Sequence, residues 1–277
     1  MPLDQVDVDK IDSPSMSDEK EMSFIEHLEE LRWHLIRAIS SIMVIAIIVF
    51  AAGRWVFDHV LLAPKQPDFI TYRLVSKVVP FSPPDFQLET RVLGEQFFVH
   101  LKVSFILGLI FAFPFILWEI WKFIKPGLYE VERKAARGFV WICSLLFALG
   151  VSFGYFIISP VAVTFLASYD MGAIAAPTLD SYVNSILMFT FPTGLIFELP
   201  ILAYFLTRIG LIDAKFMRTY RKHAFVAFFV LAAIITPPDV ITQFLIAIPL
   251  YILYEVSIYV VRNVEAREEV KELAAGS

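Results

Sequence analysis

Six long apolar segments, separated by polar or proline-rich stretches, dominate the pattern of this chain. They cover residues 34–53, 97–123, 139–158, 185–206, 224–236 and 240–261. A helix of about 20 apolar residues crosses the roughly 30 Å hydrocarbon core of a bilayer, so the pattern predicts six transmembrane helices. The fifth is expected to be short, because it covers only about 20 Å at 1.5 Å per residue. Pro249 in the middle of the sixth segment suggests that it is effectively short as well.

The stretches beside these segments give the expected boundaries. We predict a flexible cytoplasmic tail at residues 1–21, a membrane domain at 22–262 and a cytoplasmic C-terminal tail at 263–277. An amphipathic stripe that begins at Ser23 predicts a lead-in helix lying on the membrane surface. The prolines of residues 54–96 predict a turn-rich segment with at most one short helix, near its end.

Lysine and arginine side chains are concentrated in two loops, which follow the second and the fourth apolar segments. The loop at residues 159–184 contains neither residue type. Basic loops face the cytoplasm by the positive-inside rule. The charge pattern therefore predicts that both ends of the chain are cytoplasmic.

Composition requires a lipid environment and excludes several classes of function. Hydrophobic residues make up 58% of the chain and charged residues 18%, against about 45–50% and 25% in a soluble domain. One cysteine allows no disulfide within the chain, and a net charge of −5 offers no basic face for nucleic acid. No phosphate-binding loop or zinc-ligand motif is present. We expect a protein with no cofactor and no metal.

Glu198 lies well inside the fourth apolar segment, in the sequence FELP. A charged side chain at the bilayer centre costs about 2.5–3.5 kcal/mol on the insertion scale. We therefore expect Glu198 to face a wet cavity or a partner and to have a function. The alternative is a neutral carboxyl group hydrogen-bonded to the helix backbone that Pro200 leaves free.

Further carboxylates lie where the predicted cytoplasmic face begins, at Glu30 beside Arg32 and at Glu132 beside Arg133. Two carboxylates on one face beside the membrane would form a site for a dication, and the planar guanidinium fork suits carboxylate pairing. The charges permit a receptor for arginine-bearing peptides without requiring one.

Several ordered motifs in the chain closely resemble the TatC family, the multispanning component of the twin-arginine protein translocase. The resemblance covers about residues 22–262. The motifs are HLEELR at 27–32, WKFIKPGLY at 121–129, ERK at 132–134, FELP at 197–200 and TPPD at 236–239 followed by Gln243.

The resemblance implies an all-α integral membrane protein with six helices in a glove-like, concave arrangement. It implies a receptor for twin-arginine signal peptides of folded proteins, and a core scaffold for export driven by the proton-motive force. TatA-like and TatB-like single-span proteins would be its partners, with self-association in a receptor complex. It would be a multi-pass protein of the cell inner membrane, not an enzyme, and would not bind nucleic acid.

The resemblance also implies roles for particular residues. The signal-peptide-binding surface would comprise Glu30, Arg32, Glu119, Phe123, Leu128, Glu132 and Arg133. Glu119 stands where other members often carry glutamine, and would add negative charge to the cavity if ionised. Glu198 matches a buried acid of the family, Thr236 and Asp239 match an extracytoplasmic hairpin, and Gln243 falls in a polar patch where partner helices dock.

Two other functions are weighed from the residues. A proton-coupled secondary transporter could use Glu198, but such folds predict internal inverted repeats, which the chain lacks. An intramembrane hydrolase could use Ser152, in the GxSxG pattern of residues 150–154. That pattern requires a strand-to-helix turn, whereas here it lies in an apolar helical segment where small residues favour close packing.

Overall fold

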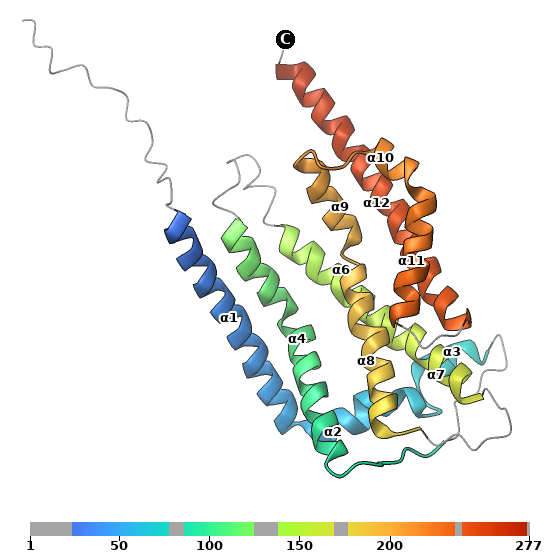
Figure 1. The fold of residues 1–277 in the computed structure, drawn as a ribbon. Helices are drawn as coiled ribbons and strands as arrows, with labels where there is room; N and C mark the ends of the chain where they lie inside the picture. Colours follow the sequence, from blue (N-terminus) through green and yellow to red (C-terminus); the bar gives the residue numbers. More distant parts are fainter. Residues whose placement is uncertain (1–23, 78–85, 125–137, 169–176, 236–239, 276–277) are drawn as a thin grey trace, which may run out of the picture.

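The structure is a computed structural model that describes residues 24–77, 86–124, 138–168, 177–235 and 240–275. Almost all of this part is helical (Figure 1). The principal helices are α1 (Phe24–Ala51), α4 (Glu95–Ile124), α6 (Phe139–Phe153), α7 (Ser159–Ser168), α8 (Leu179–Ile196), α9 (Leu199–Arg208), α10 (Ala214–Thr219), α11 (Arg221–Ile235) and α12 (Val240–Ala275).

Five stretches of the described chain are long and apolar enough to cross a membrane. They are formed by α1, by α4, by α6 continued through α7, by α8 continued through α9, and by the apolar part of α12. The one predicted span that remains, the fifth along the sequence, is α11, whose 15 residues cover about 22 Å. The prediction of an all-helical membrane protein is confirmed, and the short α11 agrees with the short fifth segment.

The ends of several spans differ from the expectation. The lead-in helix is not a separate surface element, because α1 runs unbroken from Phe24 and contains no glycine or proline. The expected shortness of the sixth span is wrong, since α12 continues through Pro249 for 36 residues, past the expected boundary at residue 262. The third helix also extends beyond the predicted segment, to Ser168.

The third helix passes Pro160 by means of a wider turn. Residues Gly154–Ile158 form a π-helical turn, η6, between α6 and α7. Proline lacks an N–H group, so the carbonyl of Phe156, four residues earlier, loses its helical partner. The hydroxyl of Thr71 donates a hydrogen bond to that carbonyl instead. A hydrogen bond between distant segments thus replaces the helical hydrogen bond that Pro160 removes.

Close helix packing depends on two glycines. A Cβ on Gly154 would collide with the backbone of Phe189 on α8, and one on Gly108 of α4 would lie 2.9 Å from the Cβ of Ala46 on α1. The GxSxG pattern is therefore a helix-packing motif, as the sequence favoured. Ser152 itself is exposed on a helical face, so the strand-to-helix turn that a hydrolase requires is missing.

The segment after α1 is more helical than expected. It contains α2 (Gly53–Val56), the π-helical turn η2 (Phe57–Leu61), the 3-10 turn η3 (Ala63–Lys65) and α3 (Ile70–Val75). The prediction of at most one short helix is wrong. Three buried or half-buried tyrosine hydroxyls explain the order, because each donates to a carbonyl of this segment.

Two of these tyrosine bonds join the segment to the membrane helices, and the third lies within the segment. Tyr155 donates to Val60 at 2.6 Å, Tyr182 to Leu61 at 3.0 Å and Tyr72 to Pro64 at 2.9 Å. Each hydrogen bond satisfies a carbonyl at the end of a short turn, where no helical partner exists. Burial of the Tyr72 hydroxyl also raises its pKa.

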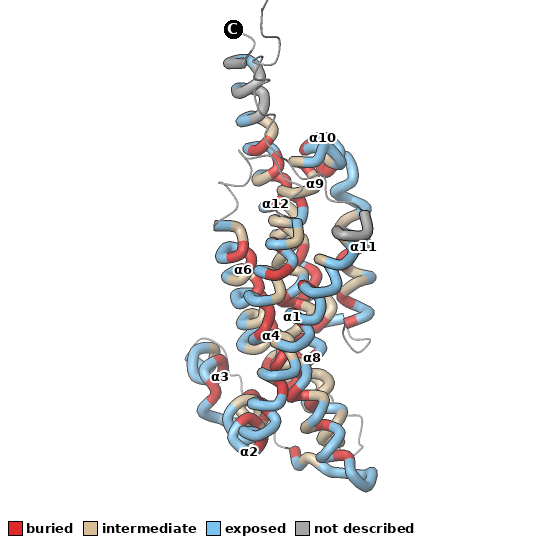
Figure 2. Tube along the Cα trace, turned by 90° about the vertical axis from the view of Figure 1, so that its left-hand side faces the viewer, coloured by how far each residue is buried: buried red, intermediate tan, exposed pale blue. Residues whose placement is uncertain are grey.

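The arrangement places the functional end of the molecule. The beginning of α1, the end of α4 and the end of α12 lie at the top of Figure 1, with α2 and α3 at the opposite end. The charge pattern predicts that the top faces the cytoplasm, and we refer to it as the predicted cytoplasmic end. Figure 2 shows that α1 and α11 expose much of their outer surface, as expected for helices that face lipid.

Candidate binding site at the α1–α4 end

Glu30 and Glu119 are brought together by a histidine between them. α1 and α4 pack side by side (Figure 1), and the register places His34 of α1 against Glu119 of α4. The Nδ1 atom of His34 lies 2.8 Å from Oε2 of Glu119, and its Nε2 atom lies 3.8 Å from Oε1 of Glu30. One buried imidazole thus contacts both carboxylates. We call Glu30, His34, Arg37, Glu119 and Lys122 the Glu119 cluster.

The charge of Glu119 is balanced by cations. Its side chain is only 1% exposed, Lys122 approaches Oε1 at 2.8 Å, and the Nε atom of Arg37 lies 3.3 Å from Oε2. A buried carboxylate without such partners would be strongly destabilising. The sequence suggested that Glu119 adds negative charge to the cavity, whereas in the structure that charge is offset locally.

Glu30 differs from Glu119 because part of it is free to bind. Its side chain is one-third exposed. Its Oε2 atom is buried and has no hydrogen-bond partner within the described residues. A carboxylate oxygen without a donor favours a cationic N–H group, and a guanidinium can fill that role with good geometry. The arrangement at Glu30 therefore suits the capture of a hydrogen-bond donor.

An aromatic side chain forms one wall of the site. The Phe123 ring stacks on His27 with centroids 4.4 Å apart and meets His34 edge-on at 6.2 Å. Arg32 is exposed on α1, and no ion pair joins it to the Glu119 cluster in the described chain. The other predicted site residues, Leu128, Glu132 and Arg133, lie outside the described residues.

His34, Arg37 and Lys122 are not among the site residues predicted from the sequence. Their spacing along the chain was a usable signal. Glu30, His34 and Arg37 recur at helical spacing on one face of α1, and Lys122 follows Glu119 by three residues. What the sequence lacked was the register between α1 and α4, which close packing at Gly108 sets.

Glu198 lies at a break in the fourth span, between α8 and α9. It precedes α9, whose first turn contains Pro200, but its side chain does not cap that helix. Its carboxylate instead lies beside the Cys143 thiol and the backbone of Phe147, both on α6. Its Oε1 atom is buried with no partner in the described part of the chain. The alternative that the sequence left open, a hydrogen bond from Glu198 to its own helix backbone, is not seen among the described residues.

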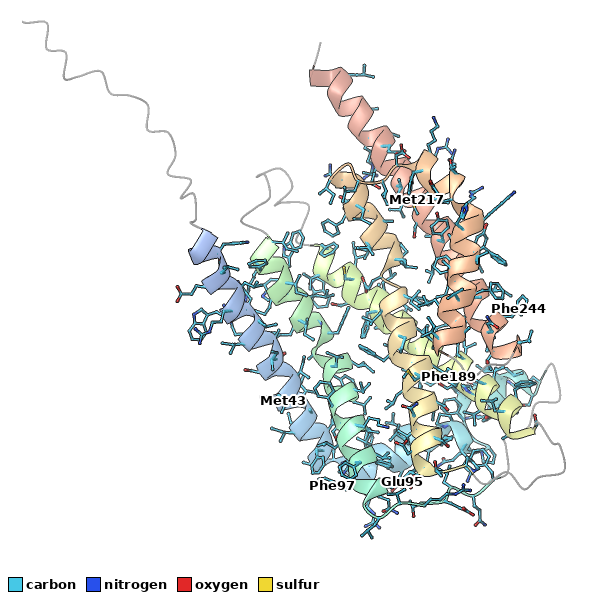
Figure 3. The ribbon with its side chains drawn as sticks, in the orientation of Figure 1. Met43, Glu95, Phe97, Phe189, Met217 and Phe244 are labelled. Atoms are coloured by element: carbon cyan, nitrogen blue, oxygen red, sulfur yellow. The ribbon has the colours of Figure 1, made fainter. Side chains whose placement is uncertain are left out.

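Gln243 is engaged inside the hairpin of α11 and α12. Its Nε2 atom donates to the carbonyl of Phe229 at 2.9 Å. The neighbouring Phe244 is 46% exposed and is seen on the outer side of α12 in Figure 3. Thr236 and Asp239 lie outside the described residues. Within the described chain, no group of three or more metal-ligating side chains is present.

The fold and the candidate site define a multi-pass α-helical membrane protein with a cluster of charged side chains at one end of its first two long helices. The sequence model of the family described as "Sec-independent protein translocase protein (TatC)" matches residues 26–249. The chain therefore belongs to the TatC family. This confirms the resemblance and leaves the transporter alternative without support.

Named relatives and solved structures agree with this assignment. The chain is 39% identical to TatC of Blattabacterium, with 88% of this chain and 97% of the relative covered. It is 35% identical to TatC of Carboxydothermus hydrogenoformans, with 91% and 97% covered. A crystal structure of the twin-arginine translocase receptor TatC superposes with a TM-score of 0.68 at 34% identity and covers 87% of this chain and 100% of that one.

Proposed function

We propose that this protein is the receptor subunit of a twin-arginine translocase in the cell inner membrane. It binds the paired arginines of signal peptides on folded proteins and acts as the scaffold on which single-span TatA-like and TatB-like partners assemble, with self-association in the receptor complex. Export is driven by the proton-motive force, and the protein itself catalyses no reaction. The observation that carries this proposal is the unpartnered Oε2 atom of Glu30 at the predicted cytoplasmic end.

Glu30 accepts the first guanidinium group. Its free oxygen provides a charge-assisted hydrogen bond, which is about twice as strong as a neutral one. Phe123 forms an aromatic wall beside Glu30, and guanidinium groups stack favourably on aromatic faces. His34, held by Glu119, fixes the position of the Glu30 side chain.

The second guanidinium group requires a second acceptor. Glu132 supplies it in our proposal, because two adjacent arginines on a peptide carry two charges and the Glu119 charge is already paired. Leu128 and Arg133 complete the surface around Glu132. Arg32, two residues after Glu30 and exposed on α1, belongs to the wider recognition surface in our proposal.

Partner helices dock against the opposite side of the molecule in our proposal. Gln243 lies on α12 beside the exposed ring of Phe244. A polar group within an apolar helix surface can bind a polar group of a neighbouring span. Thr236 and Asp239 of the extracytoplasmic hairpin, together with Glu198, would complete the surface that the partners recognise.

Binding of a twin-arginine peptide to the purified full-length protein tests the proposal. Glu30→Gln keeps the size of the side chain and removes its charge, so we expect the affinity to fall about ten-fold or more. Glu29→Gln is the matched control, because Glu29 is the adjacent carboxylate on α1 and is exposed. A peptide with both arginines replaced by glutamine sets the background.

The two variants must differ for the proposal to stand. Equal loss of affinity in Glu29→Gln and Glu30→Gln would indicate general electrostatic attraction and not a site. Unchanged affinity in a Glu30→Gln, Glu132→Gln double variant would remove the basis of the receptor proposal.

A further inference from the structure

A polar pocket lies between α10 and α12, separate from the Glu119 cluster. Its volume is about 440 Å³. Met217 of α10, labelled in Figure 3, marks its place near the top of the molecule. The lining residues are Ala214, Lys215, Arg218, Thr219, Arg262 and Glu265.

The pocket carries more positive than negative charge. Three cations, Lys215, Arg218 and Arg262, face a single carboxylate, Glu265. One oxygen of Glu265 is already used, because it accepts the backbone N–H of Ala214 at 2.7 Å. The three cations make no ion pair with the side chains that the structure describes. Their charge is therefore available to an anion.

A neighbouring carboxylate does not change this balance. Asp213, directly before α10, uses its side chain to accept the backbone N–H of Phe216 and so caps the helix. Thr219 directs its hydroxyl to the carbonyl of Lys215. The polar groups that are not cationic thus have partners within the protein.

The surroundings place the pocket at the depth of lipid headgroups. α9 leads out of the membrane domain toward the pocket and α11 leads back (Figure 1). Between them, aromatic and aliphatic side chains are exposed: Ile209 64%, Leu211 68%, Phe216 50% and Tyr220 45%. Aromatic rings with one polar end gather at the membrane–water interface. A segment that exposes such rings beside free cations is typical of contact with the interface.

We propose that this pocket binds the phosphate headgroup of an anionic phospholipid in the predicted cytoplasmic leaflet. The guanidinium forks of Arg218 and Arg262 suit phosphate oxygens, and Lys215 adds a point charge. Basic pockets between membrane helices on the cytoplasmic side bind anionic headgroups by this chemistry. A lipid and not a soluble anion is the occupant, because the stretch between α9 and α11 that carries two of the cations also exposes apolar side chains that acyl chains can cover.

Binding of this lipid links two parts of the chain. Lys215 and Arg218 lie on α10, whereas Arg262 lies on α12, 44 positions after Arg218 in the sequence. A headgroup that contacts both helices bridges them. The existing bridge between them is the bond from Ala214 to Glu265, and the lipid would add to it.

Lipid binding to the purified, delipidated full-length protein tests this proposal. We would add phosphatidylglycerol, phosphatidylcholine or inorganic phosphate in turn, and measure bound lipid by native mass spectrometry and the thermal unfolding midpoint. We expect retention of phosphatidylglycerol with a raised midpoint, and no comparable effect of phosphatidylcholine or phosphate. Each cation near an anionic surface contributes about a five-fold factor, so a Lys215→Gln, Arg218→Gln, Arg262→Gln variant should lose about 100-fold in affinity.

A charge-matched variant provides the control. Arg54→Gln, Arg73→Gln and Lys77→Gln remove three exposed cations at the other end of the molecule, and should leave the affinity for phosphatidylglycerol unchanged. If the triple pocket variant does not fold, Glu265→Gln still tests the proposal. It removes the one negative charge and keeps an oxygen acceptor for Ala214, so it should strengthen binding.

Any one of four results would overturn the proposal. Two concern the ligands: equal binding of both lipids, or full stabilisation by inorganic phosphate alone. Two concern the variants: weaker phosphatidylglycerol binding in Glu265→Gln, or unchanged binding in a folded triple pocket variant.

Discussion

Glu119 and Glu198 both lie within spans of this protein, and their surroundings differ in one respect. Glu119 on α4 is paired with two cations, Arg37 and Lys122, and contacts the imidazole of His34. Glu198, between α8 and α9, lies beside a thiol and a backbone group and makes no ion pair among the described residues. Each of the two carboxylates has at least one buried oxygen atom.

The difference separates a carboxylate with a structural role from one that is available to bind a ligand or partner. A buried carboxylate that is paired with cations holds its neighbours in place, and removal of it leaves those cations unpaired. A carboxylate with neutral partners holds less in place and retains an oxygen for a ligand or partner. We therefore assign Glu119 to the support of Glu30, and expect Glu198 to matter for interaction more than for stability.

The largest effect is expected at Glu119. Glu119→Leu leaves Arg37, Lys122 and the His34 imidazole without their common partner, and we expect the free energy of unfolding to fall by about 2–3 kcal/mol. This is less than for a fully buried pair, because Arg37 and Lys122 are each about half exposed and water can solvate them. Unfolding of the detergent-solubilised protein would measure it. A change below 0.5 kcal/mol would contradict the assigned role.

The next effect concerns His34, which connects the two carboxylates. His34→Ala should lower the affinity for a twin-arginine peptide about five-fold, because Glu30 loses the neighbour that orients it. His34→Gln retains a polar group and should recover part of that loss. Peptide titration measures both variants. Equal affinities for the alanine and glutamine variants would mean that a polar group at this position does not orient Glu30.

A smaller effect is expected where Glu198 meets α6. Cys143→Val removes the thiol that lies beside the carboxylate, and we expect a loss of about 1 kcal/mol in unfolding free energy. Cys143→Ser retains a donor and serves as the control. If the Cys143→Val variant is as stable as the original protein, the contact between Cys143 and Glu198 contributes nothing to the free energy of unfolding.

The smallest change in stability is expected at Glu198 itself. Glu198→Gln should alter the unfolding free energy by less than about 0.5 kcal/mol, because no cation depends on this carboxylate. Export of a folded reporter with a twin-arginine leader should nevertheless decrease. Export at the original level would assign Glu198 to structure alone, and a stability loss as large as that of Glu119→Leu would remove the contrast.

The hydropathy pattern was sufficient for the membrane helices and insufficient for their ends. Lipid allows a spanning backbone few forms, so long apolar segments must be helices. The continuation of the third helix to Ser168 depends on η6 and on the bond from Thr71 to Phe156. The helices after α1 depend on tyrosines more than 80 positions away along the chain for two of their bonds. Such contacts have no local signal.

The arrangement of the candidate site was predicted in part. Glu30 and Phe123 followed from the family resemblance, and both lie beside His34 in the structure. The bridging role of His34 and the neutralisation of Glu119 did not follow, because they depend on the register of α1 against α4. A glutamate in one span and a histidine in another are two separate observations until packing at Gly108 joins them.

The most direct test of the account is a double-mutant cycle between receptor and peptide. Affinities would be measured for the original protein, Glu30→Gln and Glu119→Gln, each with a twin-arginine peptide and with peptides in which either arginine is replaced by glutamine. We predict a coupling energy of about 1 kcal/mol or more between Glu30 and one arginine, and a value near zero for Glu119. Coupling to Glu119 with none to Glu30 would contradict the account.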